Sequence, residues 1–135
     1  MKLNGKKFMV IGGAGLIGSH TIENLLKEDI KEIVVYDNFT RGRVKNLEDA
    51  LKDPRVSIHD VGGDILQTDI LTAAMKDREI DGVFHLAALW LLQCHNFPRS
   101  AFNTNVAGAF NVMEACVANN INRLVVMETY HLCPD

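Results

Sequence analysis

The sequence lacks the features that mark several broad classes of protein. Its longest apolar runs fall well short of the roughly 20 residues that a membrane-spanning helix needs, so a membrane protein is not expected. Basic residues are scattered and slightly outnumbered, with 14 Lys and Arg against 17 Asp and Glu. The resulting net charge of −3 provides no basic stripe for nucleic acid and no patch for an anionic membrane surface.

Cysteine is also scarce, and its pattern argues against two further classes. The three cysteines, Cys94, Cys116 and Cys133, include no Cys-x-x-Cys pair, so neither a disulfide framework nor a metal site is predicted. The first residues contain neither the apolar core nor the cleavage site of a signal peptide. We therefore expect a cytoplasmic protein with reduced thiols and no metal ion.

What is present fits a single globular domain over residues 1–135. Apolar residues make up 47% of the chain and charged residues 23%, which is ordinary for a soluble domain. A chain of this length buries roughly two thirds of the surface of its unfolded form, which is enough for a core. No internal repeat, low-complexity tract or linker divides the chain.

Apolar runs and amphipathic segments alternate along the sequence. Short apolar runs predict five strands, over residues 7–11, 32–36, 56–59, 81–86 and 123–127. Helices are predicted between them, over residues 16–27, 43–52, 68–76 and 100–119. The last helix is the longest, and we expect its packing face to consist of Phe102, Val106, Ala109, Met113, Cys116 and Val117.

This alternation predicts an α/β fold. Strands that are joined by helical crossovers form a parallel sheet with right-handed connections. We therefore expect a three-layer, doubly wound parallel sheet of the Rossmann type, with five strands in the order 3-2-1-4-5. In such a sheet a ligand binds beyond the carboxyl ends of the strands, where the strand order reverses.

The turn after the first predicted strand has the spacing of a phosphate-binding loop, with glycines at positions 12, 15 and 18. Gly12 permits a sharp turn, Gly15 lets the backbone approach a diphosphate, and Gly18 lets the next helix pack closely on the sheet. The N–H groups and the positive dipole end of that helix then face the phosphate charge. Because the glycines follow a strand and open a helix, we interpret them as a dinucleotide site rather than as a tight turn alone.

An acidic residue ends the second predicted strand, 19 residues after the last of these glycines. Asp37 is placed to accept hydrogen bonds from the adenosine ribose, and its charge repels a 2′-phosphate, which favours NAD over NADP. Arg41 and Arg43 lie nearby and could soften that preference, or could belong to a solvated loop. Asp64 and Ile65 could bracket the adenine, or could form the turn that starts a helix.

Five segments together resemble one protein family. They are IGGAGLIGSH (residues 11–20), YDNFTRG (36–42), GDI (63–65), FHLAA (84–88) and NTNVAGAFNVMEA (103–115). In order and spacing they resemble the extended short-chain dehydrogenase/reductases. Within these they are similar to the NAD-dependent epimerase/dehydratase family, which acts on nucleotide sugars and includes UDP-glucose 4-epimerase. The resemblance covers residues 7–126 and corresponds to the N-terminal, cofactor-binding portion of that family.

The resemblance implies a set of residues around the cofactor. Leu16 and Ile17 join the three glycines at the diphosphate, Asp64 and Ile65 flank the adenine, and Asn105 matches an asparagine that orders the nicotinamide end. The other positions line the adenosine side or pass beneath the cofactor. They are Asp37, Asn38, Phe39, Thr40, Arg41 and Gly42 on the adenosine side, and Leu86, Ala87, Ala88 and Leu89 beneath.

The sequence departs from the family at its catalytic positions. The family's acid/base is a tyrosine followed four residues later by a lysine that lowers its pKa. Neither tyrosine of this chain, Tyr36 or Tyr130, has a lysine at that spacing. By the resemblance, Thr129 aligns with the hydroxyl residue that hydrogen-bonds the substrate. Trp90 stands where some members carry a phosphate-contacting lysine.

Two functions are consistent with this sequence. The first is the NAD-binding part of a nucleotide-sugar epimerase or dehydratase, catalytically incomplete because the tyrosine–lysine pair and the C-terminal substrate lobe are missing. The second is a non-catalytic NAD-binding or interaction module. In both cases the fifth strand would lack its next neighbour, so we expect a homodimer through the strand-5 edge.

Overall fold

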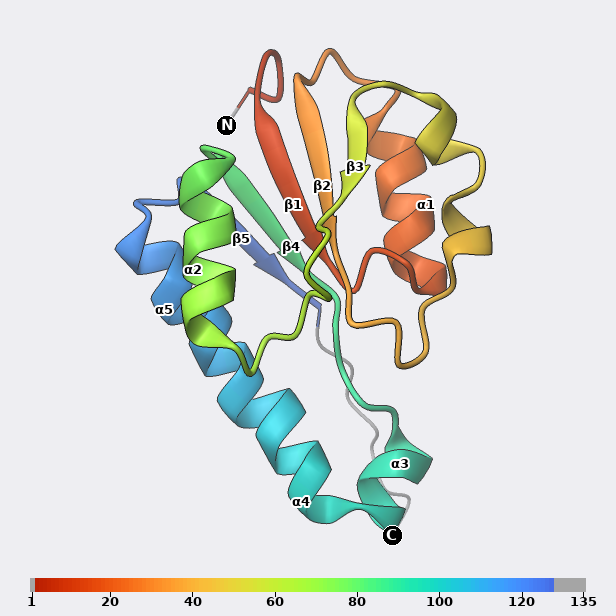
Figure 1. Cartoon of the computed structure of the whole chain (residues 1–135), viewed down its shortest axis with the longest axis vertical. Coiled ribbons are helices and arrows are strands. Elements are labelled where there is room, and N and C mark those ends of the chain that lie inside the picture. Colours follow the sequence, from red (N-terminus) through yellow and green to blue (C-terminus); the bar gives the residue numbers. More distant parts are fainter. Residues whose placement is uncertain (1, 128–135) are drawn as a thin grey trace, which may run out of the picture.

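The computed structural model describes residues 2–127 and contains five strands in one parallel sheet (Figure 1). The strands are β1 (Lys7–Ile11), β2 (Glu32–Tyr36), β3 (Val56–Ile58), β4 (Gly82–His85) and β5 (Arg123–Val126). Their order is β3-β2-β1-β4-β5, and each neighbouring pair is parallel. The predicted Rossmann-type fold and strand order are therefore confirmed.

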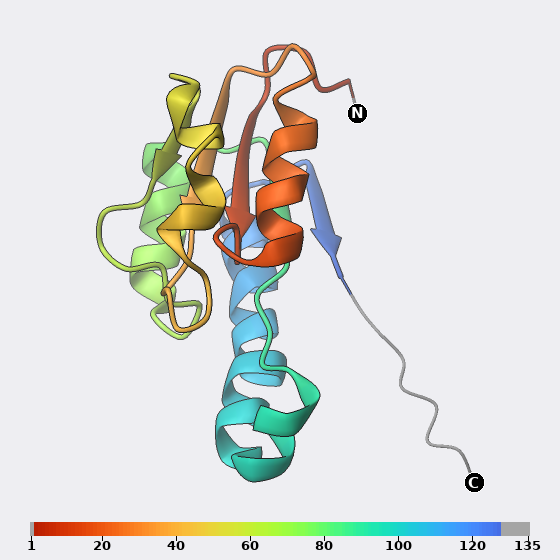
Figure 2. The same cartoon turned by 90° about the vertical axis from the view of Figure 1, so that its right-hand side faces the viewer.

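Helices cover both faces of the sheet (Figures 1 and 2). One face carries α1 (Leu16–Leu25) with the short 3₁₀ helices η1 (Val44–Leu47) and η2 (Ala50–Lys52), and the other carries α2 (Thr68–Asp77) and α5 (Ala109–Ala118). Alternate residues of β1 contribute to the two cores, with Phe8 and Val10 in one and Met9 and Ile11 in the other. The central strands are continuous apolar runs because both of their faces are buried.

The predicted helical segment over residues 43–52 is replaced by two short 3₁₀ helices, η1 and η2. Hydrogen bonds tie its beginning to the glycine-rich turn. The Arg43 N–H and the Asn46 side-chain amide donate to the carbonyl oxygen of Ala14, at 3.0 and 2.8 Å. The segment therefore follows the surface of that turn. α1 also ends earlier than predicted, at Leu25.

The last predicted helix, over residues 100–119, begins earlier and is not regular. After α3 (Leu91–Asn96), the chain forms α4 (Pro98–Ala101), a π-helical segment η3 (Phe102–Gly108) and then α5. These three segments follow one continuous helical path (Figure 1). In a π-helix the backbone bonds span five residues instead of four, which rotates the side chains relative to an α-helix.

The packing face predicted for this helix is wrong at most of its positions. Four of its large side chains are 44–78% exposed: Phe102, Val106, Met113 and Val117. The buried positions are mostly small: Gly108, Val112, Ala115 and Cys116. A Cβ added at Gly108 would lie 2.5 Å from Cδ1 of Ile65, so small residues allow the helix to approach the rest of the domain closely.

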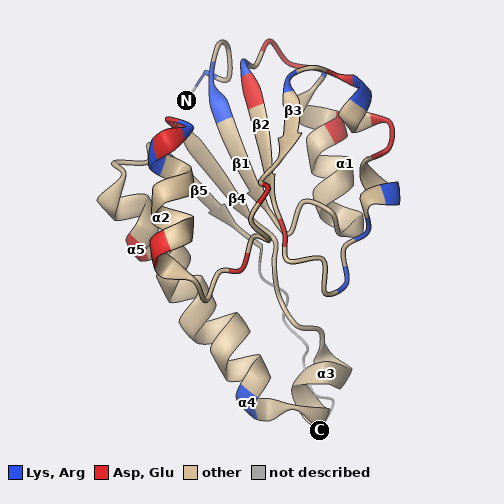
Figure 3. Ribbon diagram, viewed as in Figure 1, with Lys and Arg blue, Asp and Glu red and all other residues tan. Residues whose placement is uncertain are grey.

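Ion pairs close the amino-terminal end of the sheet. Lys6 bonds Asp81 at 2.9 Å and Lys7 bonds Glu79 at 2.8 Å. Figure 3 shows charged residues at this end of the sheet and also on the loops at its carboxyl end, whereas α3 carries none. The opposite end of the sheet is open. A cleft lies there, beyond the carboxyl ends of β1 and β4.

None of the helices within residues 2–127 is both long enough and apolar enough to span a membrane.

Candidate functional site

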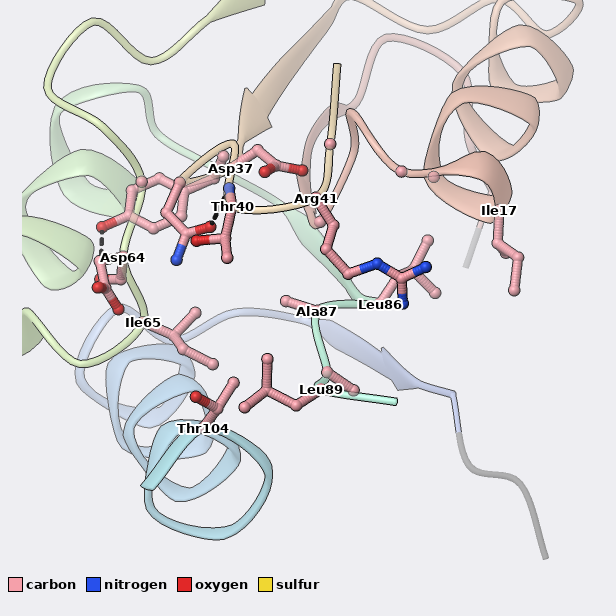
Figure 4. A pocket seen from close by; sticks show the side chains of 18 of the residues that line it. Ile17, Asp37, Thr40, Arg41, Asp64, Ile65, Leu86, Ala87, Leu89 and Thr104 are labelled. Carbon is pink, nitrogen blue, oxygen red and sulfur yellow. Dashed lines mark hydrogen bonds between the residues drawn. The ribbon is translucent and has the colours of Figure 1, made fainter. Parts of the chain in front are cut away.

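A cleft of about 790 Å³ opens beyond the carboxyl ends of β1, β2 and β4 (Figure 4). The loops that follow these strands form most of its wall, and η3 contributes to the far side. The cleft brings together most residues predicted for the dinucleotide: Gly12, Gly15, Leu16, Ile17, Gly18, Asp37, Asn38, Thr40, Arg41, Gly42, Asp64, Ile65, Leu86, Ala87, Ala88 and Leu89.

Two glycines allow backbone segments to touch at the base of this cleft. Gly12 has a φ of +77°, and a Cβ there would lie 2.8 Å from the backbone nitrogen of Ala87. A Cβ at Gly18 would collide with the carbonyl oxygen of Gly12 and lie 2.6 Å from Cα of Gly13. The turn after β1 therefore packs directly against both the loop after β4 and the first turn of α1.

The start of α1 faces the cleft with free hydrogen-bond donors. Gly15 is the N-cap residue, and it supplies no side-chain hydrogen bond to the first turn. Leu16 and Ile17 are 72% and 50% exposed. The first N–H groups of a helix have no partner within it, so this end of α1 can bind an anion.

Asp37 lies at the carboxyl end of β2 and is 8% exposed. Its Oδ2 accepts a hydrogen bond from the Ala14 N–H at 3.0 Å, and its Oδ1 accepts one from the Phe39 N–H at 2.8 Å. The carboxylate thus fixes the glycine turn and its own loop in relation to each other. Each oxygen keeps capacity to accept a further hydrogen bond, and Asp37 lines the cleft.

The loop after Asp37 separates its side chains between the cleft and the core. Asn38 Oδ1 accepts a hydrogen bond from the Thr40 N–H at 3.0 Å, and Phe39 has a φ of +57°. This conformation turns Phe39 into the cluster beneath α1. Phe39, predicted on the adenosine side, therefore does not line the cleft, whereas Thr40 does.

Asp64 and Ile65 form another part of the wall, beside the aromatic ring that ends β2. The Tyr36 hydroxyl donates to the carbonyl oxygen of Asp64 at 3.2 Å, and Asp64 Oδ1 accepts a hydrogen bond from the Leu66 N–H at 2.9 Å. Burial, reinforced by the nearby charge of Asp64, raises the pKa of Tyr36 to about 12. Tyr36 is therefore a structural phenol that stays protonated at neutral pH.

Asn105 does not line the cleft but binds the backbone of Leu89, which does. It lies in the π-helical segment, where Oδ1 accepts a hydrogen bond from the Leu89 N–H at 2.7 Å and Nδ2 donates to the Leu89 carbonyl oxygen at 3.0 Å. The side chain clamps the backbone of the loop after β4. Its neighbour Thr104 takes the position on the cleft wall.

The sequence pattern did not point to part of the far wall. The segment from α3 to η3 adds four lining residues: Gln93 in α3, Phe97 between α3 and α4, Ser100 in α4 and Thr104 in η3. They form no recognisable motif, and only the Pro98 helix start marks their region. Thr129, the predicted catalytic hydroxyl, lies outside the described residues, so its role stays a prediction.

The sheet order, the glycine turn and the open start of α1 define a Rossmann-type domain of the kind that binds dinucleotides. Residues 8–132 match the sequence profile of a family described as polysaccharide biosynthesis protein, and the chain belongs to this family.

Sequence relatives indicate which enzymes within this family the chain resembles. The UDP-glucose 4-epimerase of Rickettsia bellii (strain OSU 85-389) is 34% identical over 128 residues, which cover 92% of this chain and 36% of that enzyme. The resemblance to the N-terminal portion of the NAD-dependent epimerase/dehydratase group is confirmed. The chain spans about a third of the length of these relatives.

Solved structures agree with the sequence matches. The UDP-Glc/GlcNAc 4-epimerase from Campylobacter jejuni superposes with a TM-score of 0.82 at 27% identity, over 90% of this chain and 36% of that one. The UDP-glucose 4-epimerase from Brucella ovis, solved in complex with NAD, gives a TM-score of 0.77 at 28% identity, over 90% of this chain and 35% of that one.

Proposed function

We propose that this chain binds NAD in the cleft at the carboxyl ends of its strands. The observation that carries the proposal is the glycine turn, where a bare backbone meets the open start of α1 and leaves room for a diphosphate. The adenosine then lies along Asp37, Asp64 and Ile65, and the nicotinamide lies toward Leu89. The related enzyme from Brucella ovis was solved with NAD, which supports this assignment.

We further propose that the chain is the cofactor-binding part of a nucleotide-sugar epimerase, an isomerase. The names of its relatives support this substrate class, since they act on UDP-glucose or UDP-Glc/GlcNAc. The sugar would approach the nicotinamide end, where Gln93, Ser100 and Thr104 provide polar groups.

These 135 residues alone are proposed to be catalytically incomplete. A proton must leave or join the sugar oxygen when a hydride is transferred, and no tyrosine–lysine pair is present to carry it. Tyr36 cannot substitute, because its pKa of about 12 and its hydrogen bond to Asp64 keep it protonated. A non-catalytic NAD-binding module is the second candidate, and the same observation favours it.

Calorimetric titration with NAD, NADP and UDP-glucose in parallel tests the binding proposal. We expect NAD to bind, NADP to bind at least tenfold more weakly, and UDP-glucose to bind poorly. Gly15→Ala is the matching variant. The φ of −75° at this N-cap suits alanine, and the added Cβ would lie 3.3 Å from the Gly12 carbonyl oxygen, a contact that a small backbone shift relieves. We expect the extra methyl to keep a diphosphate from approaching the backbone. Unchanged NAD affinity in this variant would contradict the proposed site.

An epimerisation assay with UDP-glucose tests the catalytic proposal. The 135-residue chain saturated with NAD should give no turnover above background. Substantial turnover would refute catalytic incompleteness without affecting the binding proposal.

We also propose that the chain forms a homodimer through β5. We propose a cytoplasmic location as well. Among the described residues β5 pairs with β4 alone, and its exposed Val125 lies at that edge. Unpaired strand edges favour association. Sedimentation velocity should detect a dimer for the wild type, and Val125→Lys should weaken it. A wild-type protein that stays monomeric at high concentration would contradict the proposed dimer.

A further inference from the structure

Two exposed side chains contact each other from loops on opposite sides of the glycine turn. Arg41 belongs to the loop after β2, and Trp90 precedes α3 in the loop after β4. The guanidinium carbon of Arg41 lies 5.1 Å from the centre of the Trp90 ring. Because β1 lies between β2 and β4 in the sheet, this contact spans the end of β1, where the glycine turn begins.

Figure 4 shows the course of the arginine side chain. Arg41 leaves its loop beside Asp37 and extends toward the side of the cleft where Ile17 and Leu86 lie. The guanidinium of Arg41 therefore lies nearer to the start of α1 than the backbone of its own loop does.

The charges that line the cleft make this position significant. Among the described lining residues, Arg41 and Arg43 are the only cations, and Asp37 and Asp64 are the carboxylates. Both oxygens of Asp37 accept backbone N–H groups, and Arg41 takes part in none of the ion pairs found within residues 2–127. A dinucleotide brings two negative charges to the glycine turn, which itself supplies only N–H donors.

We propose that Arg41, held in place by the face of Trp90, is the cation that binds the diphosphate of the dinucleotide. The inference rests on the proposed function, and it names the residue whose positive charge binds the diphosphate. A guanidinium that packs on an aromatic ring keeps its N–H donors available for phosphate oxygens. Trp90 is then a positioning residue, which acts on the ligand through Arg41.

Three ligands separate the contribution of Arg41 from general binding. NAD and ADP-ribose carry the diphosphate, and adenosine does not. Arg41→Ala should weaken NAD and ADP-ribose by about 30-fold and leave adenosine within about twofold. Arg43→Ala removes the same charge from the same cleft without the ring contact, and its effect should be several-fold smaller. Arg41→Lys, which keeps the charge and loses the planar fork, should fall between wild type and Arg41→Ala.

Trp90 provides two independent measurements because it is the only tryptophan of the chain. Trp90→Leu removes no charge, yet it should weaken ADP-ribose about fivefold, while Trp90→Phe retains part of that affinity. The fluorescence of wild-type Trp90 should change when ADP-ribose binds and should not respond to adenosine. Circular dichroism of each variant verifies that the fold is intact.

The possible outcomes are distinct. If the wild type binds neither NAD nor ADP-ribose, the proposed function and this inference both fail. If it binds NAD but Arg41→Ala behaves like Arg43→Ala, or Trp90→Leu has no effect on ADP-ribose, the inference alone is overturned.

Discussion

Single atoms at the glycine turn decide whether two loops of the cleft can touch. At Gly12 an added methyl group would meet backbone atoms, which cannot rotate out of the way as a flexible side chain would. The positive φ adds a second cost, because L-residues rarely adopt it. The steric collision and the backbone strain can be separated experimentally, because Gly5 also has a positive φ but lacks the collision.

Gly12→Ala should lower the free energy of unfolding by about 2–4 kcal/mol, because it combines left-handed strain with collision against Ala87. Urea denaturation followed by circular dichroism measures this change. Gly5→Ala is the matched control, since Gly5 has a φ of +68° and no described atom lies within 4 Å of the position of its missing Cβ. It should cost only about 1 kcal/mol. Equal losses in both variants would mean that the close approach of Gly12 to Ala87 contributes nothing to the loss of stability.

Asp37 illustrates how one carboxylate can serve both structure and selectivity. Asp37→Asn places an NH₂ group opposite an N–H donor, so one of its two hydrogen bonds is lost. The free energy of unfolding should fall by about 1–3 kcal/mol, and the preference for NAD over NADP should narrow. The exposed Asp60→Asn removes the same charge and should leave stability nearly unchanged. Denaturation and parallel titrations with the two dinucleotides measure both effects.

At the scale of elements, the π-helical segment and the loop after β4 are joined by one amide group. Asn105→Ala removes both hydrogen bonds to Leu89. The Leu89 N–H should then exchange with solvent at least tenfold faster, which NMR hydrogen exchange can follow. Asn103→Ala, on the exposed side of the same segment, should leave this rate unchanged. A protected Leu89 amide in the Asn105 variant would mean that the loop is held by other contacts.

The positions of the strands could be predicted from sequence because β1 and β2 are buried on both faces and therefore form unbroken apolar runs. The packing face of the last helix could not. Between Pro98 and Ala118 only Arg99 and Glu114 are charged, so the pattern has little polar contrast. Periodicity alone cannot tell which of two apolar stripes packs on the sheet, and η3 also changes the period.

The candidate site divides in the same way. Gly12 and Gly18 were predictable because close backbone approach requires glycine at that spacing, and Asp37 lines the cleft where the end of the second strand predicted it. Phe39 packs against the core instead of lining the cleft, because of a positive φ that leaves no trace in the sequence. Gln93 and Thr104 belong to the cleft through the packing of helices, and no short-range pattern encodes that.

At the scale of the whole molecule, a buried histidine should make stability depend on pH. His85 is 4% exposed and its Nδ1 has no hydrogen-bond partner among residues 2–127, and burial lowers its pKa. Below about pH 6.5 the unfolded chain binds a proton that the folded chain does not. The free energy of unfolding should therefore decrease as the pH falls from 7.5 to 5.5.

Urea denaturation at both pH values measures this dependence. His85→Gln should remove much of the decrease, whereas His20→Gln, at an exposed position beside Glu23, should not. An identical pH dependence in wild type and His85→Gln would exclude His85 as its cause.

The cleft draws its walls from Gly12 through to Thr104, so nearly the whole chain must be assembled before it exists. A dinucleotide that binds there recognises only the completed sheet, and its binding free energy adds to the cooperative stability of the domain rather than to one loop. In a cell, the nucleotide supply would then set the fraction of this protein that escapes proteolysis. The cofactor would in that sense act as a folding ligand before it acts in any chemistry.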